Sequence, residues 1–320
     1  MRIGDKLISN TVYLFLDWLL VSLFSFIFWF ILGKTHSPSD VGIVAISINL
    51  ILLISSFSTL GITNALKKLI PEFKEKKGLE AVYPIIKLSF KPILISLVIT
   101  FIILLVFSNQ FSFFVKIPYY AFLLCIISII VISIYDVFGS VLYGLQNMRK
   151  LFLTDFAQIV IRVLFTGLLI SLVFNYFLQY KDHLYLFSLI SFLSGYFLIL
   201  FFRFNFNYLN SGLSISYKKL FFYSTPALIS TVASTLMLRG EYIILVILEN
   251  TEITGIFTIA FTITSVIGIL ATTPSSGIYP IISALSVNKQ TKRKQGYLIG
   301  LVIRYSLFLT LPLSLLLMFF

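Results

Sequence analysis

The chain has 320 residues, of which 59% are hydrophobic and only 11% are charged, and its mean hydropathy is +1.03. Soluble domains are typically about 25% charged, so these values exclude an ordinary water-soluble fold. The net charge of +12 is spread over short segments between apolar runs. This distribution favours contact with anionic membrane lipids over nucleic-acid binding.

Apolar runs long enough to cross a bilayer recur along the chain. A helical crossing needs roughly 20 apolar residues, and helices are expected because lipid offers no hydrogen-bond partner to an exposed backbone. The first run is too long and bulky for a cleaved signal peptide. We predict nine crossing helices, at about residues 9–33, 41–66, 88–108, 119–145, 152–178, 184–204, 222–247, 254–284 and 297–320.

The basic residues predict an orientation for these helices. With nine crossings, 18 of the 24 Lys and Arg residues fall on the side of the N-terminus, and only Lys34, Lys116 and Lys181 fall on the other side. Cytoplasmic loops of membrane proteins carry such an excess. We therefore expect a multi-pass protein of the plasma membrane with a cytoplasmic N-terminus.

Residues that commonly carry catalysis or bind metals are scarce. Cys125 is the only cysteine, so neither a disulfide framework nor a cysteine metal site is expected. His36 and His183 stand apart in predicted loops, where we expect them to be solvated. No nucleotide-binding motif and no arrangement of catalytic residues is found. The sequence therefore predicts no enzyme, no cofactor and no metal.

An internal repeat divides the chain. Residues 39–94 resemble residues 252–309, and both segments are predicted to run in the same direction through the membrane. The matching positions are glycines and basic residues: Gly42 with Gly255, Gly61 with Gly277, and 74–77 with 292–294. Parallel repeats of this kind build transporters from two lobes.

The repeat predicts a domain organisation. Residues 1–204, with six helices, would form an N-terminal lobe, and residues 205–320, with three, would begin a C-terminal lobe. If the second lobe repeats the first, about three further helices are expected after Phe320.

Four segments resemble the polysaccharide-biosynthesis flippases, the Wzx-type O-antigen and oligosaccharide-lipid exporters of the MOP superfamily, which also holds the MATE drug exporters. The segments are FSFIFWFILGKTHSPSDVGIVAIS, LYGLQNMRKLFLTDFAQIVIRVLFTGLL, LFFYSTPALISTVASTLMLRGEYIILVIL and EITGIFTIAFTIT. The resemblance implies an all-α, MATE-like bundle of two lobes. It also implies that alternating access moves a polyprenyl- or dolichyl-diphosphate-linked oligosaccharide to the outer leaflet, with a glycan polymerase or glycosyltransferases as expected partners.

Ionisable residues within the predicted helices are the candidate site residues. Each costs about 2.5 to 3.5 kcal/mol in hydrocarbon and therefore tends to face a wet cavity or a partner. Asp155, Gln158, Arg162 and Thr166 recur at spacings of three and four, which puts them on one helix face. The candidates for binding a diphosphate are Arg162, Arg239 and Arg304, and those for ion coupling are Asp17, Asp136 and Glu241.

Other interpretations stay open at this stage. The charged groups could pair between helices and only stabilise the bundle. Pro226, Pro274 and Gly277 mark possible hinges, but a static kink fits them equally well. The chain could also be a MATE-like cation or drug antiporter, whose cavity should present carboxylates without arginines. A membrane scaffold is a further alternative, and it would need neither carboxylates nor arginines in a cavity.

Overall fold

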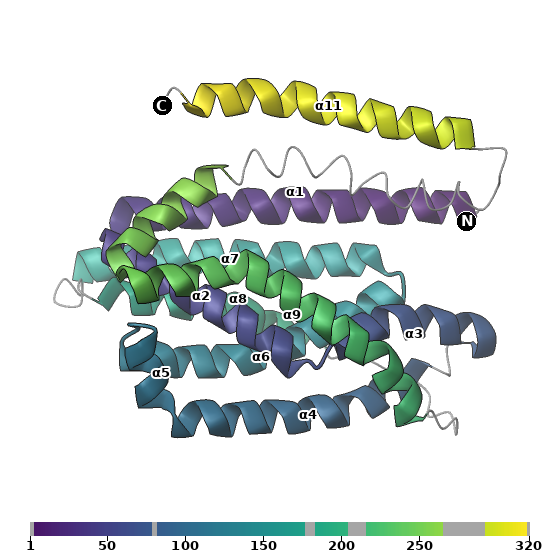
Figure 1. Ribbon diagram of the computed structural model, residues 1–320, viewed down its shortest axis with the longest axis horizontal. Helices are drawn as coiled ribbons and strands as arrows, with labels where there is room; N and C mark the ends of the chain where they lie inside the picture. Colours follow the sequence, from purple (N-terminus) through teal and green to yellow (C-terminus); the bar gives the residue numbers. More distant parts are fainter. Residues whose placement is uncertain (1–2, 79–81, 177–182, 204–215, 265–291, 319–320) are drawn as a thin grey trace.

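A computed structural model describes residues 3–78, 82–176, 183–203, 216–264 and 292–318 (Figure 1). The described residues form helices that lie roughly along one axis of the molecule, and α11 runs along the upper edge in this view. The helices are α1 (Ile3–Thr35), α2 (Pro38–Ser58), α3 (Ile62–Lys77), α4 (Val82–Val106), α5 (Ser108–Phe114), α6 (Tyr119–Gly144), α7 (Met148–Tyr176), α8 (Leu184–Arg203), α9 (Tyr217–Leu248), the helix Thr251–Thr264 and α11 (Lys292–Met318).

The described helices agree with an all-α polytopic membrane bundle. Six are long and apolar enough to cross a bilayer, within α1, α2, α4, α6, α7 and α9, and three shorter apolar helices lie in Leu184–Phe197, Thr251–Thr264 and Val302–Pro312. Each predicted crossing therefore has a helix in its described part, although the number nine is only approximate and residues 265–284 of the eighth crossing lie outside the described residues. The outer face of α4 is apolar, with Val98, Ile99 and Ile102 more than half exposed, as expected for a surface that faces lipid.

One predicted crossing was wrong in its extent. The run 41–66 is interrupted, because α2 ends at Ser58 and α3 begins at Ile62. Leu60 and Gly61 have φ angles of +52° and +67° in between, a left-handed conformation that ends a helix. Residues 74–77, expected in a loop, lie in α3, whose apolar side is buried at Leu66, Leu69 and Ile70.

Helix α2 forms the centre of the bundle. Ser37 caps it by accepting a hydrogen bond from the Asp40 amide at 3.2 Å, and Pro38 follows at the first position, where its missing N–H costs nothing. Most of its residues are buried in one hydrophobic core with α6 and α8. A helix that is apolar on all sides has to be surrounded by others. Helix α9 also packs along α2.

We name the two ends of the bundle by residues that lie there. The His36 end holds the α1–α2 turn, the turn before α6 and the turn after α9. The α3 end holds α3 and the first turns of α9.

Repeat-related glycines meet at the His36 end. A Cβ atom built on Gly42 would lie 1.8 Å from the Thr251 carbonyl oxygen, and one built on Gly255 would lie 1.8 Å from that of Pro38. The two contacts are reciprocal, as if related by a two-fold axis. Only glycine permits such an approach of two backbones.

Candidate functional site

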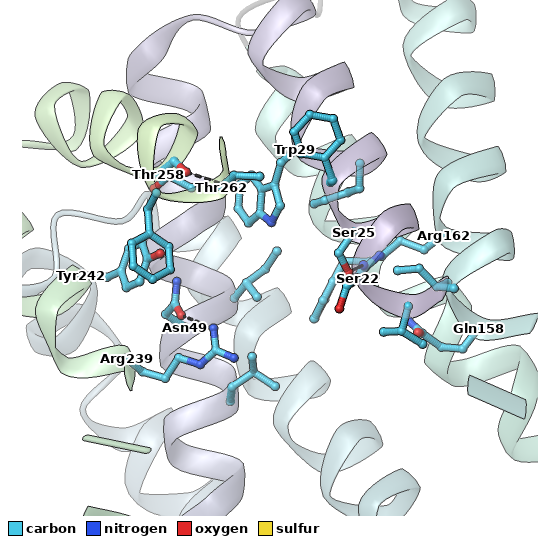
Figure 2. A pocket seen from close by; sticks show the side chains of 18 of the residues that line it. Ser22, Ser25, Trp29, Asn49, Gln158, Arg162, Arg239, Tyr242, Thr258 and Thr262 are labelled. Carbon is cyan, nitrogen blue, oxygen red and sulfur yellow. Dashed lines mark hydrogen bonds between the residues drawn. The ribbon is translucent and has the colours of Figure 1, made fainter. Parts of the chain in front are cut away.

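A cavity of about 330 Å³ lies inside the bundle, and we call it the central cavity. Its walls come from α1, α2, α7, α8, α9 and the helix Thr251–Thr264, so it lies between segments that are far apart in the sequence. Two of the predicted diphosphate ligands, Arg162 and Arg239, both line it. Figure 2 shows them on opposite sides, Arg162 beside Gln158 and Arg239 below Tyr242.

Arg162 is buried and held in place by neutral groups. Its Nη2 atom donates a hydrogen bond to Ser25 Oγ at 2.9 Å. The guanidinium carbon lies 4.8 Å from the Phe28 ring centroid and 5.4 Å from that of Phe192, distances typical of cation–π contacts. The Nε atom of Arg162 and the Nε2 atom of Gln158 have no hydrogen-bond partner among the described residues.

Arg239 is anchored to the opposite wall through an amide. Its Nη1 atom donates to Asn49 Oδ1 at 2.9 Å, and Asn49 Nδ2 in turn donates to the Ala45 carbonyl at 2.8 Å. The second bond fixes which way the amide points. Arg239 is therefore oriented by α2 although it belongs to α9.

The described charged residues that line the central cavity are all positive. Among the described residues that line it, two are arginines and none is acidic. Neither arginine forms an ion pair within the described part of the chain, and Glu241, two positions after Arg239 on the same helix, attracts Arg239 from beyond ion-pair distance. The alternative that these two side chains serve as ion-pair links between helices therefore has no support in the described contacts.

The rest of the central cavity is polar and aromatic. Hydroxyl and amide side chains line it together with several aromatic rings: Ser22, Ser25, Asn49, Gln158, Thr258, Thr262, Trp29, Tyr196 and Tyr242. Such a lining offers donors and acceptors for a ligand rich in hydroxyl groups. It also offers ring faces for stacking.

A second cavity of about 460 Å³ continues toward the α3 end, and we call it the mixed-charge cavity. It shares Leu52 and Arg239 with the central cavity. Lys67, Asp136 and Asp155 also line it. The Tyr135 hydroxyl donates a hydrogen bond to Asp155. Acidic residues thus appear in the cavity that lies beyond Arg239.

The expected polar face of 152–178 is observed in α7. Asp155 lines the mixed-charge cavity, and Gln158 and Arg162 line the central one. Thr166, one turn further, lies 2.8 Å from Ser191 Oγ of α8. The recurrence of polar residues every three or four positions was sufficient to predict this helix face.

Four other candidates lie elsewhere. Asp17 and Glu241 are half-buried but line neither cavity, and Arg304 is exposed on α11 and also lines neither. Pro226 lies within α9, which continues through it from Tyr217 to Leu248. The two other hinge candidates, Pro274 and Gly277, lie outside the described residues.

One loop residue was misjudged, because His36 is buried rather than solvated. Its Nε2 atom lies 2.8 Å from Ser188 Oγ of α8, and its Nδ1 atom lies 2.8 Å from Thr35 Oγ1. Burial lowers the pKa of His36 from 6.5, against opposing contributions from the Leu184 backbone and Asp40.

Several residues of the site were missed. Asn49, Ser25 and the two phenylalanines around Arg162 were not singled out, and neither was Lys67. Asn49 carried a signal, because it is an amide within a long apolar run. Ser25 and the phenylalanines carried none, since such residues are common in membrane helices.

Comparison with known proteins agrees with this architecture. The sequence matches the family described as polysaccharide biosynthesis protein over residues 7–286. The chain belongs to this family. No curated protein matches the sequence significantly.

Three solved structures resemble this polysaccharide biosynthesis family member. The MATE multidrug transporter DinF-BH, whose structure was solved as a complex, matches with a TM-score of 0.71 at 15% sequence identity. The match covers 99% of this chain and 75% of the DinF-BH chain. An inward-facing MATE family transporter of the MOP superfamily matches with a TM-score of 0.56 at 14% sequence identity, and the match covers 95% of this chain and 78% of that transporter.

A third match is a MOP superfamily transporter from Pyrococcus furiosus that is described as having a binding pocket of reverse polarity. Its TM-score is 0.54 at 14% sequence identity, and the match covers 96% of this chain and 79% of that transporter. At these identities the likeness shows the fold. The polysaccharide biosynthesis protein described here is thus a multi-pass membrane protein with the fold of MATE and MOP transporters.

Proposed function

We propose that the protein is a flippase that carries a polyprenyl- or dolichyl-diphosphate-linked oligosaccharide across the membrane. The observation that carries the proposal is the pair of arginines, Arg162 and Arg239, on opposite walls of one cavity with no acidic residue among its described lining. Membership of the polysaccharide biosynthesis family supports the glycan part of the substrate.

The electrostatic argument starts from the lipid carrier. A diphosphate bridge brings about two negative charges into the membrane, and moving them unpaired through hydrocarbon would be prohibitive. Guanidinium groups suit this ligand because they are planar, always charged and able to bind phosphate oxygens with two parallel hydrogen bonds. Arg162 retains an unpartnered donor, Nε, for such a bond.

The neutral lining suits the glycan. Hydroxyls of Ser22, Thr258 and Thr262 can exchange hydrogen bonds with sugar hydroxyls, and Trp29 can stack on a sugar ring. The mixed-charge cavity extends this polar space beyond Arg239. A diphosphate between the arginines would leave both spaces for sugars.

The same cavity argues against an antiporter for cationic drugs. A cation in the central cavity would meet two arginines and no described carboxylate, so its electrostatic interaction would be repulsive. A scaffold would not need buried arginines, because burying a charge without an acidic partner is costly. Both alternatives therefore fit the site less well than a diphosphate carrier does.

The distribution of charge supports an orientation of the chain in the membrane. The α3 end carries Lys67, Lys68, Lys74 and Lys218, and the His36 end carries few basic residues. The positive-inside rule supports a cytoplasmic α3 end, and we propose the plasma membrane as the location because a flippase for cell-surface glycans acts there. The two lobes, 1–204 and 205–320, would then expose the cavity alternately to each side. Asp136 and Asp155 are our candidates for coupling transport to an ion gradient, because they line the mixed-charge cavity.

The test compares arginine variants of the full-length protein in vesicles that contain a labelled polyprenyl-diphosphate oligosaccharide. We expect Arg162→Ala and Arg239→Ala each to lower transport by about 10- to 100-fold, since each removes hydrogen bonds to a charged group. Lysine at either position should recover only part of the activity, because it lacks the planar fork.

Arg304→Ala is the matched control. It removes the same side chain from α11, where it is exposed and lines neither cavity, and it should leave transport within about twofold of the unaltered protein. If both cavity variants transport normally while remaining inserted and abundant, the diphosphate is not held by these arginines and the proposal fails.

A further inference from the structure

A groove at the α3 end lies outside both cavities. It has a volume of about 730 Å³ and runs between α3 and the first turns of α9. Two lysines, Lys68 and Lys218, line one part of it, and three aromatic residues, Phe221, Phe222 and Tyr223, line another. The remaining lining residues are small or polar: Asn64, Ala65, Thr225, Pro226 and Ala227. We call it the α3–α9 groove.

The cations of this groove are available to a ligand. Lys68 and Lys218 are exposed, and neither has an acidic partner among the described residues. The Lys68 ammonium lies 4.2 Å from the centroid of the Tyr223 ring. Lys219, the next residue along α9, is different, because it pairs with Glu72 at 3.0 Å and does not line the groove.

The apolar wall lies beside these charges. Phe222 is 71% exposed and Phe221 is 39% exposed, on the first turns of α9. Tyrosine rings such as that of Tyr223 are common at the level of lipid headgroups, and the wholly apolar rings of Phe221 and Phe222 suit contact with acyl chains. A ligand with phosphates next to an apolar chain would contact both parts of the groove at once.

The groove continues into the interior. Asn64 lines both the groove and the mixed-charge cavity, and Arg239 lines both the mixed-charge and the central cavity. Basic residues recur at each stage of this path: Lys68 and Lys218, then Lys67, then Arg239, then Arg162. Between groove and cavity, Asn64 Nδ2 donates to Thr231 Oγ1 at 2.7 Å.

We propose that the α3–α9 groove is a separate loading site, where the diphosphate of the lipid-linked substrate binds before it enters the cavities. The inference rests on the proposed function for the identity of the ligand. Two unpaired ammonium groups match the two charges of a diphosphate, and the continuity through Asn64 gives the bound headgroup a way inward. Opening requires the Asn64–Thr231 hydrogen bond to break.

The test uses a photoreactive polyprenyl diphosphate and the full-length protein in phosphatidylcholine vesicles, with labelled peptides identified by mass spectrometry. In an Arg162→Gln/Arg239→Gln background, residues 221–226 should still be labelled, because the groove does not include either arginine. Adding Lys68→Gln and Lys218→Gln should lower this labelling by about tenfold or more, since both ammonium groups are lost.

Two control variants separate charge from folding. Lys68→Arg with Lys218→Arg keeps both charges and should keep the labelling. Lys91→Gln removes an exposed lysine of α4 that lies outside the groove lining, and it should change labelling by less than about twofold.

The contrary outcomes are distinct. Labelling of 221–226 that survives the double lysine-to-glutamine change overturns the loading site. Equal competition by phosphatidylglycerol and by unlabelled polyprenyl diphosphate makes the groove a general anionic-lipid site and overturns it as well. Normal transport by the arginine variants would instead contradict the proposed function, and it would not alter the labelling result.

Discussion

The two ends of the bundle are held together by different combinations of contacts. At the His36 end, the backbone of α2 meets the backbone of the helix Thr251–Thr264 at Gly42 and Gly255. At the α3 end, the backbone of Gly61 also approaches that of α9, since a Cβ atom built there would lie 2.4 Å from the Ser224 carbonyl oxygen. Two side-chain pairs add to this contact, Asn64 with Thr231 and Glu72 with Lys219.

Further contacts reinforce the His36 end. Ser39 Oγ lies 2.9 Å from Thr251 Oγ1, and Lys116 Nζ donates to the Glu249 carbonyl at 2.6 Å. The lysine satisfies a carbonyl at the C-terminus of α9, where the helix dipole also favours a cation. The α3 end thus combines a glycine contact with side-chain pairs, whereas the His36 end has two reciprocal glycine contacts that further hydrogen bonds reinforce. We expect side-chain substitutions to loosen the α3 end more readily than the His36 end.

The largest effect is expected from Gly255→Ala. A Cβ atom at this position would lie 1.8 Å from the Pro38 carbonyl oxygen, and backbone atoms on both sides leave no rotamer to relieve the clash. We expect the His36 end to stay open and transport to fall by at least about tenfold. A cysteine at Thr258 in the central cavity should become more reactive toward a membrane-impermeant maleimide added from the His36 side.

The control for this experiment is Gly240→Ala, because no neighbouring atom lies within 4 Å of a Cβ built there. The native cysteine, Cys125, is buried and should not react. Unchanged labelling and transport in Gly255→Ala would show that the glycine contact does not determine closure of the His36 end.

The second prediction concerns pH at the His36 end. His36 Nδ1 lies 2.8 Å from Thr35 Oγ1 and Nε2 lies 2.8 Å from Ser188 Oγ, so a neutral ring can form hydrogen bonds through both nitrogens. Because burial lowers the pKa of His36 in the folded protein, its contribution to stability is complete above about pH 6.5 and is lost as the pH falls below that value.

The measurement is the Tm of the protein in detergent at pH 7.5 and at pH 5.5. We expect a lower Tm at the acidic pH and a smaller difference between the two values in His36→Gln, which cannot titrate. His183→Gln is the matched control, since His183 is exposed. An equal loss of Tm in His36→Gln and in the unaltered protein would contradict the assignment.

Sequence reasoning located the elements better than the contacts between them. Apolar runs identified the helices because crossing length is fixed by the bilayer. Periodicity placed Gln158 and Arg162 on one face of α7. The repeat matched Gly42 with Gly255, but an internal alignment carries no information about whether equivalent positions touch.

Contacts between distant segments could not be predicted from a single sequence. Asn49 and Arg239 are 190 positions apart, and Ser188 and His36 are 152 apart. Nothing local to His36 distinguishes it from a solvated loop residue. The end of α2 was more accessible to prediction, because Gly61 followed by an amphipathic basic segment is a helix-stop signal.

The third prediction concerns the hydrogen bond at the α3 end. Asn64→Ala removes the donor to Thr231, and Thr231→Val removes the acceptor. Each should lower the free energy of unfolding by about 1 kcal/mol, and the double variant should cost less than the sum because both changes remove the same bond. Chemical denaturation in detergent measures the three values, and strict additivity would show that the two side chains are not coupled.

The smallest effect is expected at the Glu72–Lys219 ion pair. The two side chains are 25% and 37% exposed, and partly exposed ion pairs contribute about 0 to 1 kcal/mol, less at high salt. Glu72→Gln should therefore lower Tm only slightly, and raising the salt concentration should reduce the difference. Lys219→Gln should cost more, because the ammonium also lies 4.3 Å from the centroid of the Phe73 ring, a contact that salt screens less. If Glu72→Gln at low salt destabilises the protein as much as Asn64→Ala does, and high salt removes that effect, the ion pair is as strong a closure of the α3 end as the Asn64–Thr231 bond.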